Sequence, residues 1–155
     1  RVSSCLWPFL RRVFFFGRIL YTITLGPRRW AITFRATVAS LTVEQRAAAL
    51  GLSDKLSVHR DLESTGEVRF DTVVCLDVLE HLPDPSAQLQ AFHQRMASDA
   101  TALLNWYFFK GHDGEYPFHF DDPQLVDQFF TTLQGRFLEV FHQLLITARL
   151  YRPIA

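Results

Sequence analysis

The distribution of hydrophobic and polar positions along residues 42–155 predicts alternating strands and helices. Short apolar runs bounded by polar or turn-forming residues predict strands, and the run at 71–76 is continuous enough to be buried on both faces. The predicted strands cover residues 55–60, 71–76, 101–109, 136–142 and 145–152. Apolar residues at helical spacing predict helices over residues 43–50, after a cap at Ser86, and over 123–133.

Strands that alternate with short helices favour parallel strands joined by helical crossovers. The last two predicted strands are separated by only a few residues, which favours an antiparallel hairpin at a sheet edge. The expected fold class is therefore α/β, with a Rossmann-like, mostly parallel sheet and an antiparallel final strand. A chain of 155 residues is long enough to bury one core and too short for two ordinary domains.

The amino-terminal segment, residues 1–41, departs from this pattern in composition. Residues 1–43 contain seven arginines and no acidic residue, whereas residues 44–155 contain all 16 acidic residues. We therefore divide the chain into an atypical basic and aromatic segment, 1–41, and an α/β domain, 42–155. Two explanations stay open for the segment: truncated or out-of-frame coding, or a native basic arm. Strands are compatible with "ILYTITL" and "WAITFRATV" within it.

We expect a cytoplasmic protein without a nucleic-acid partner. The formal net charge is +0, so charge gives no support for nucleic-acid binding. The two cysteines, Cys5 and Cys75, lack metal-site spacing and fit a reducing compartment. Arginines interrupt the apolar amino-terminal runs, which argues against a membrane span or a signal peptide. A helix on a membrane surface remains an alternative.

Three polar residues follow the predicted strand at 71–76, within "FDTVVCLDVLEHLPDP" (70–85): Asp77, Glu80 and His81. In open parallel sheets, ligands bind beyond the carboxyl ends of the strands. On a helical turn, positions i, i+3 and i+4 project to one side. The three residues could cap the loop, act as acid, base or substrate contact, or hold a divalent cation.

A second polar and aromatic segment lies at 110–122, "KGHDGEYPFHFDD". Its metal-ligating residue types have no helical ligand spacing, and a lone loop rarely completes a coordination shell, so we expect a solvated loop and no metal. The residues concerned are His112, Asp113, His119, Asp121 and Asp122. Nearby aromatic side chains suit the wall of a planar or apolar acceptor site, although core packing explains them equally well. They are Tyr107, Phe109, Tyr116, Phe118 and Phe120.

The stretch "FDTVVCLDVLEHLPDP" resembles the fourth-strand motif of class I S-adenosylmethionine-dependent methyltransferases. In that motif, Phe-Asp and an apolar strand precede an apolar-Glu-His-apolar step and a Pro-Asp-Pro-like turn. The resemblance extends over about residues 42–152 and implies methyl transfer from S-adenosylmethionine to a small-molecule acceptor. By resemblance, Asp61 would contact adenine, with capping of a helix or turn as the alternative. Cys75, Leu76 and Asp77 would line the cofactor site, a role that overlaps with core packing for Cys75 and Leu76. His81 is the candidate general base.

Two features of the family pattern are missing from the amino-terminal segment. A glycine-rich loop should follow the first strand, but Gly26 is followed by a proline and two arginines. An acid should end the second strand and bind the ribose hydroxyls, but no acidic residue precedes Glu44. These departures predict weak or no binding of S-adenosylmethionine. The alternatives are an inactive domain that serves as a binding module, or a peripheral membrane protein that uses its basic amino terminus.

Overall fold

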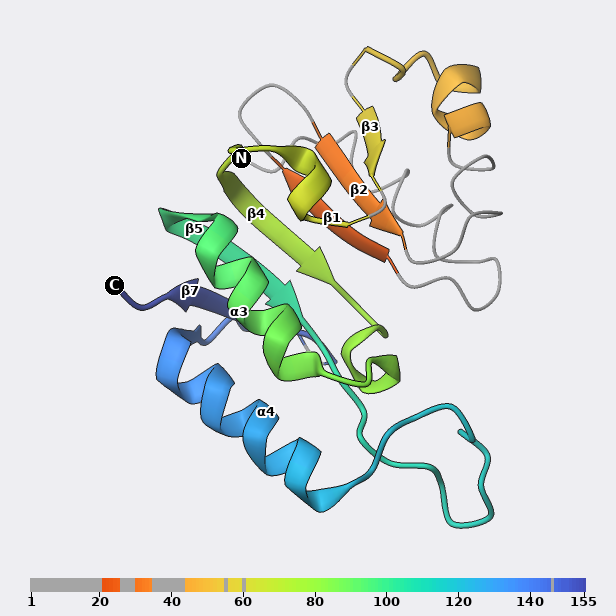
Figure 1. Ribbon diagram of the computed structural model, residues 1–155, viewed down its shortest axis with the longest axis vertical. Helices are drawn as coiled ribbons and strands as arrows, with labels where there is room; N and C mark the ends of the chain where they lie inside the picture. Colours follow the sequence, from red (N-terminus) through yellow and green to blue (C-terminus); the bar gives the residue numbers. More distant parts are fainter. Residues whose placement is uncertain (1–20, 26–29, 35–43, 55, 60, 146) are drawn as a thin grey trace.

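The computed structural model describes residues 21–25, 30–34, 44–54, 56–59, 61–145 and 147–155. These residues form a seven-stranded sheet in the order β3-β2-β1-β4-β5-β7-β6 (Figure 1). The strands are β1 (Tyr21–Leu25), β2 (Trp30–Phe34), β3 (Leu56–His59), β4 (Phe70–Cys75), β5 (Met96–Leu104), β6 (Phe137–Val140) and β7 (Arg149–Pro153). β1 and β2 fall within the two amino-terminal sequences that were compatible with strands. Gly26 and most of the basic segment lie outside the described residues.

The predicted α/β class is confirmed, and so is its mostly parallel sheet with an antiparallel final strand. β2, β3, β4, β5 and β6 run in one direction, and β7 runs antiparallel to both β5 and β6. The predicted hairpin is therefore the pair β6 and β7, which ends the sheet at one edge. The parallel neighbours β4 and β5 form its centre.

β1 is a second antiparallel strand that the sequence pattern did not predict. It runs opposite to both β2 and β4, and Leu25 at its end pairs with Thr72 near the start of β4. Only four residues, 26–29, connect β1 to β2. A connection of this length closes a hairpin, whereas a parallel crossover requires a dozen or more residues. The carboxyl end of β1 therefore lies at the opposite edge of the sheet from the carboxyl end of β4.

The strand predicted at 101–109 is wrong at both ends. β5 begins at Met96, directly after a helix, and leaves the sheet after Leu104. The aromatic residues that follow pack on a helix instead of extending the strand. Trp106 and Phe108 contact Phe129 with ring centroids 5.1 and 4.9 Å apart.

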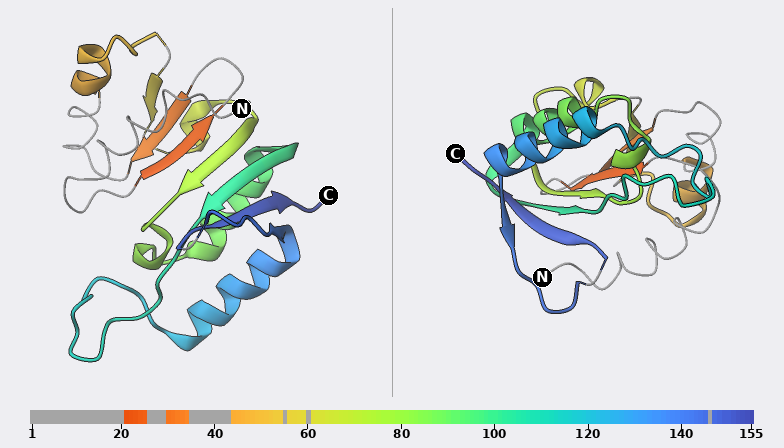
Figure 2. Two further views of the ribbon diagram at one scale, coloured as in Figure 1. Left: turned by 180° about the vertical axis from the view of Figure 1, so that it is seen from behind. Right: turned by 90° about the horizontal axis from the view of Figure 1, so that it is seen from below.

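Two long helices, α3 (Pro85–Arg95) and α4 (Pro123–Arg136), pack side by side on one face of the sheet (Figures 1 and 2). Each has proline in its first turn and an aspartate N-cap: Asp84 accepts from the Ala87 amide at 2.8 Å, and Asp122 from the Leu125 amide at 3.0 Å. The cap of α3 is thus Asp84, not Ser86. A shorter helix covers residues 44–49. None of the helices in the described part of the chain is long and apolar enough to cross a bilayer.

The hydrophobic core lies between the sheet and these two helices. Its largest side chains are almost completely buried, as expected for residues that face both the sheet and the helices. They include Phe70 and Leu104 from the sheet and Leu89, Phe92 and Phe129 from the helices. Truncation of such a buried phenylalanine to alanine costs about 3–5 kcal/mol. Packing against this core therefore holds the ends of β4 and β5 in place.

Candidate functional site

The candidate site lies where β4 and β5 end, at the same edge of the sheet. Because the two strands are parallel, the segments that follow them emerge side by side (Figures 1 and 2). β4 is followed by η2 (Leu79–His81), one turn of 3-10 helix. β5 is followed by the loop 105–122, which extends beyond the sheet before α4 begins.

Asp77 and Asn105 join the two strand ends through a reciprocal pair of hydrogen bonds. The Asp77 backbone N–H donates to Asn105 Oδ1 at 2.6 Å, and Asn105 Nδ2 donates to Asp77 Oδ1 at 2.8 Å. Asp77 has a φ of 55°, in the left-handed region that aspartate adopts more readily than most residues. This backbone turn redirects the chain from β4 into η2.

The buried part of η2 is unusual, because one of its buried side chains carries a carboxylate. Leu79 is 0% exposed and packs into the core, and the neighbouring Glu80 is only 2% exposed. Glu80 Oε2 has no hydrogen-bond partner. Burial raises the pKa of Glu80 above its ordinary value, and the Asp77 charge adds to this, while a backbone hydrogen bond and His81 oppose it.

The loop 105–122 docks on η2 through backbone groups. The Phe120 amide donates to the Glu80 carbonyl at 2.8 Å, and His81 Nδ1 lies 3.2 Å from the Phe118 carbonyl oxygen. These contacts bring His119 beside His81, with ring centroids 4.6 Å apart. Two distant parts of the sequence therefore share one site.

A pocket of about 410 Å³ opens between η2 and the loop. Tyr116 stacks on His119, with ring centroids 5.0 Å apart and planes 15° apart, and Tyr107 meets both rings edge-on. The lining combines two carboxylates, two imidazoles and two phenol rings. Its residues are Asp77, Glu80, His81, Tyr107, Tyr116 and His119.

The sequence-predicted cofactor residues are spread along this edge. Asp77 lines the pocket, while Leu76 beside it is half-buried and Cys75 is completely buried in the core. Asp61 follows β3, which is separated from β4 by the two strands β2 and β1, and its Oδ1 accepts from the Ser64 amide at 2.8 Å. Asp61 thus caps the turn η1 (Glu63–Thr65), which was the alternative to an adenine contact. The cofactor roles of these residues stay predictions.

The predicted solvated loop is found for four of its five metal-ligating residues. His112, Asp113, Asp121 and Asp122 are exposed, Asp121 pairs with Lys110 at 3.1 Å, and Asp122 caps α4. His119 is different, because it is partly buried and lies with Glu80 and His81.

The sequence did not indicate that His119 lies with Glu80 and His81, or that Asn105 forms hydrogen bonds with Asp77. For Asn105 a signal was present, since a polar residue ends the apolar run of β5 next to the polar end of β4. For His119 the local signal was its position between Phe118 and Phe120, whereas His112 lies between Gly111 and Asp113.

A profile of methyltransferase domains matches residues 20–133 of the sequence. The match covers most of the chain, including β1, β2 and the site. The chain belongs to the methyltransferase domain family. Its α/β sheet is the Rossmann-like fold of class I S-adenosylmethionine-dependent methyltransferases. No curated protein matched the sequence.

Solved structures with this methyltransferase fold align over most of the chain at low sequence identity. A protein described as an rRNA-methylase from Clostridium thermocellum has a TM-score of 0.55 and 13% identity, covering 79% of this chain and 71% of its own. A protein of Pyrococcus horikoshii OT3 has a TM-score of 0.58 and 11% identity, covering 96% and 76%. The [4+2]-cyclase SpnF has a TM-score of 0.53 and 13% identity, covering 70% and 43%. Because a cyclase is among them, the shared fold does not fix the reaction.

Of the expected S-adenosylmethionine site, the described residues provide the side that follows β4 but not the side that would follow β1. At the ends of β4 and β5, Leu76 and Asp77 are accessible, as a cofactor wall requires. The glycine-rich loop of the family follows a strand that ends at this same edge. Here β1 ends at the opposite edge, at Leu25 beside Thr72. The end of β1 therefore lies away from this side of the site, and weak cofactor binding stays a prediction.

Proposed function

We propose that this methyltransferase-family protein transfers a methyl group from S-adenosylmethionine to a small-molecule acceptor held in the pocket between η2 and the loop 105–122. The observation that carries the proposal is the pocket itself, at the edge of the sheet where this fold binds ligands. The sulfonium of the cofactor supplies an already reactive methyl group. The protein then needs mainly to position the acceptor and exclude water.

The lining of the pocket supports a small acceptor rather than a nucleic acid. Its volume of about 410 Å³ is in the range of small-molecule sites. Tyr107 and Tyr116 offer faces and edges to a planar group. Asp77 and Glu80 add negative charge, and neither lysine nor arginine is among the lining residues described. Phosphate groups, which nucleic-acid sites neutralise with basic residues, are therefore disfavoured.

His81 is the candidate base for the acceptor proton. A carbonyl oxygen only accepts hydrogen bonds, so the contact of His81 Nδ1 with the Phe118 carbonyl places the ring proton on Nδ1. The lone pair is then on Nε2, and this nitrogen can take a proton. Sequence analysis suggested the role, and the position of His81 in the pocket lining supports it.

The test uses chelator-treated protein, labelled S-adenosylmethionine at millimolar concentration and two acceptor sets. We expect label in a small aromatic acceptor and none in ribosomal or transfer RNA. His81→Ala should slow transfer by about 10²–10⁴-fold if the imidazole is the base. Labelled RNA would contradict the small-molecule proposal. Absence of transfer to either set would favour the binding-module alternative.

Cofactor affinity is expected to be low. Charge-assisted hydrogen bonds of the kind that a carboxylate makes to ribose hydroxyls contribute roughly 1.5–3 kcal/mol each. Without that acid and the glycine-rich loop, affinity should fall by about two to four decades, at about 1.4 kcal/mol per decade. Isothermal titration of the unmodified chain measures this. Micromolar affinity would show that the amino-terminal segment holds the cofactor in another way.

A further inference from the structure

Glu80, His81 and His119 bring three metal-ligating side chains together from two separate segments. One potential donor atom from each residue lies within 4.8 Å of the other two. Asp77, which the sequence grouped with Glu80 and His81, is instead bonded to Asn105. The third donor thus comes from the loop 105–122, 38 positions beyond His81 in the sequence.

Both imidazoles are held in the tautomer that binds metals through Nε2. His81 Nδ1 lies 3.2 Å from the Phe118 carbonyl, and His119 Nδ1 lies 3.1 Å from the Phe109 carbonyl. Since carbonyls only accept, each Nδ1 carries the proton and each Nε2 keeps its lone pair. Metal-binding histidines typically have their other ring nitrogen bonded in this way. Stacking of Tyr116 on His119 further fixes that ring.

The side chain of Glu80 provides a second, independent observation that points to a ligand at this site. Its side chain is 2% exposed and Oε2 has no hydrogen-bond partner. A buried carboxylate oxygen without a hydrogen-bond partner is costly, and buried charges in proteins are usually paired or bound to metals. No lysine or arginine lines the described pocket, so the side chains at the site provide no permanent positive charge.

We propose that Glu80, His81 and His119 bind one divalent transition-metal ion of the Zn²⁺ type, which fastens the loop 105–122 to η2. Two imidazoles and one carboxylate form a ligand set that suits zinc, with the fourth position left for water or an acceptor group. This replaces the expectation of no metal.

The donor spacing is compatible with such an ion after a small contraction. Tetrahedral zinc with bonds of about 2.0–2.1 Å places its donors about 3.3 Å apart. One ring nitrogen of each histidine and one Glu80 oxygen now lie up to 4.8 Å apart, so atoms at that limit would approach by about 1.5 Å to share an ion. The His81 lone pair that binds the ion is also the one that would take the acceptor proton, so a bound ion and a free base exclude each other at this residue.

The experiment is a titration of tag-free, chelator-treated protein with Zn²⁺ alone, without cofactor or acceptor. Failure of the proposed methyl transfer leaves this measurement unaffected. We expect one ion per chain with a Kd of about 10 µM or tighter. Co²⁺ should give the strong visible absorption of a four-coordinate site. A bound ion should also raise the unfolding midpoint, by an amount that grows with the logarithm of the Zn²⁺ concentration above the Kd.

His119→Ala is the decisive variant, and His112→Ala is its matched control. Both histidines lie in the same loop, but His112 is exposed and outside the cluster. His119→Ala should weaken Zn²⁺ binding about 10- to 100-fold or more, whereas His112→Ala should leave it within about twofold. Glu80→Gln, which keeps the size of the side chain, should weaken binding similarly and serves if His119→Ala is unfolded.

Two results would overturn the proposal. One is a Zn²⁺ Kd of about 1 mM or weaker in the unmodified protein. The other is equal affinity of the unmodified protein and folded His119→Ala or Glu80→Gln, which would show that any ion binds elsewhere.

Discussion

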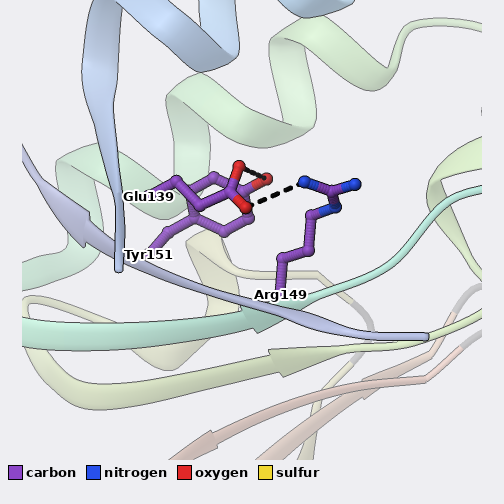
Figure 3. A network of polar contacts seen from close by, with 3 residues as sticks. All are labelled: Glu139, Arg149 and Tyr151. Carbon is purple, nitrogen blue, oxygen red and sulfur yellow. Dashed lines mark hydrogen bonds and ion pairs between the residues drawn. The ribbon is translucent and has the colours of Figure 1, made fainter. Parts of the chain in front are cut away.

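The protein contains two polar clusters built around a glutamate, and they differ in how completely that glutamate is bonded. On the final hairpin, Glu139 accepts from Arg149 at 2.8 Å through Oε1 and from the Tyr151 hydroxyl at 3.3 Å through Oε2 (Figure 3). At the end of β4, Glu80 is far more buried, yet its Oε2 has no partner. Native proteins bond nearly all of their buried polar atoms.

The difference separates a cluster that supports the fold from one that is arranged for a ligand. The hairpin cluster joins β6 to β7 and is complete within the chain. The Glu80 cluster joins two segments but leaves acceptor capacity unused, inside a pocket. Perturbed and incompletely bonded groups in a pocket are typical of functional sites, where stability is given up for binding.

The largest expected effect is an opposite response of stability to loss of the two glutamates. In chelating buffer, Glu80→Met should raise the free energy of unfolding by about 1–3 kcal/mol, because it removes a buried carboxylate with one unpartnered oxygen and keeps a side chain of similar length. Glu139→Met should lower it by about 1 kcal/mol or less, since its ion pair is exposed. Denaturant unfolding measures both variants. A loss of stability in Glu80→Met would remove the contrast.

A smaller effect should distinguish two glycines that hold the loop of the site. Gly111 and Gly114 both have positive φ, at +90° and +75°. A Cβ at Gly111 would overlap the Glu115 carboxylate and lie 3.0 Å from the Glu115 amide nitrogen, whereas one at Gly114 would meet nothing. Backbone strain is therefore common to both alanine variants, and the steric contact is specific to Gly111.

Gly111→Ala should weaken Zn²⁺ binding about tenfold, equivalent to about 1.4 kcal/mol, because the Glu115 carboxylate must move and the Glu115 amide nitrogen, 3.0 Å from the new Cβ, must give way in the loop that carries His119. Gly114→Ala should weaken it by about threefold or less. Titration with Zn²⁺ compares the two variants directly. Equal affinities would show that the loop conformation around Gly111 does not determine the site. Neither change should alter the hairpin cluster, because its ring contact with this loop, Tyr151 with Trp106, involves neither glycine.

Local pattern was enough to predict the side of the site that follows β4. The buried strand, the polar residues after it and the direction of the chain were all encoded within residues 70–85. The same holds for α4, whose apolar stripe and preceding Asp122-Pro123 define its start. For such segments, secondary-structure preference and burial agree, so sequence alone indicates where the side chains lie.

Contacts between distant segments were not predictable in this way. His119 and His112 lie seven positions apart in one polar loop, and docking of the loop on η2 is what brings His119 to the site. The direction of β1 was also missed, because the family pattern implied a parallel strand while the four-residue connection 26–29 closes a hairpin. In both cases the outcome depends on loop closure, which hydrophobic periodicity does not report.

Loss of the Tyr151 hydroxyl from the hairpin cluster should have the smallest effect on stability at neutral pH. It should also change how stability depends on pH. Burial in the core and the adjacent charge of Glu139 raise the pKa of Tyr151 above its ordinary value. A raised pKa means that the folded protein keeps the phenol proton to higher pH than the unfolded chain does. The stabilisation is therefore present below about pH 10, the ordinary tyrosine pKa, and is lost as pH rises above it.

Tyr151→Phe tests this without disturbing the buried ring. At pH 7 the variant should lose about 1 kcal/mol or less, the typical contribution of one hydrogen bond. Above pH 10 the unmodified protein should lose up to about 1.4 kcal/mol per pH unit more than the variant, because only its unfolded state has released this proton. Denaturant unfolding at pH 7, 10 and 11 gives the comparison. Parallel pH profiles of the two proteins would mean that the phenol ionises equally in both states and that the Glu139 cluster is looser than its hydrogen bonds indicate.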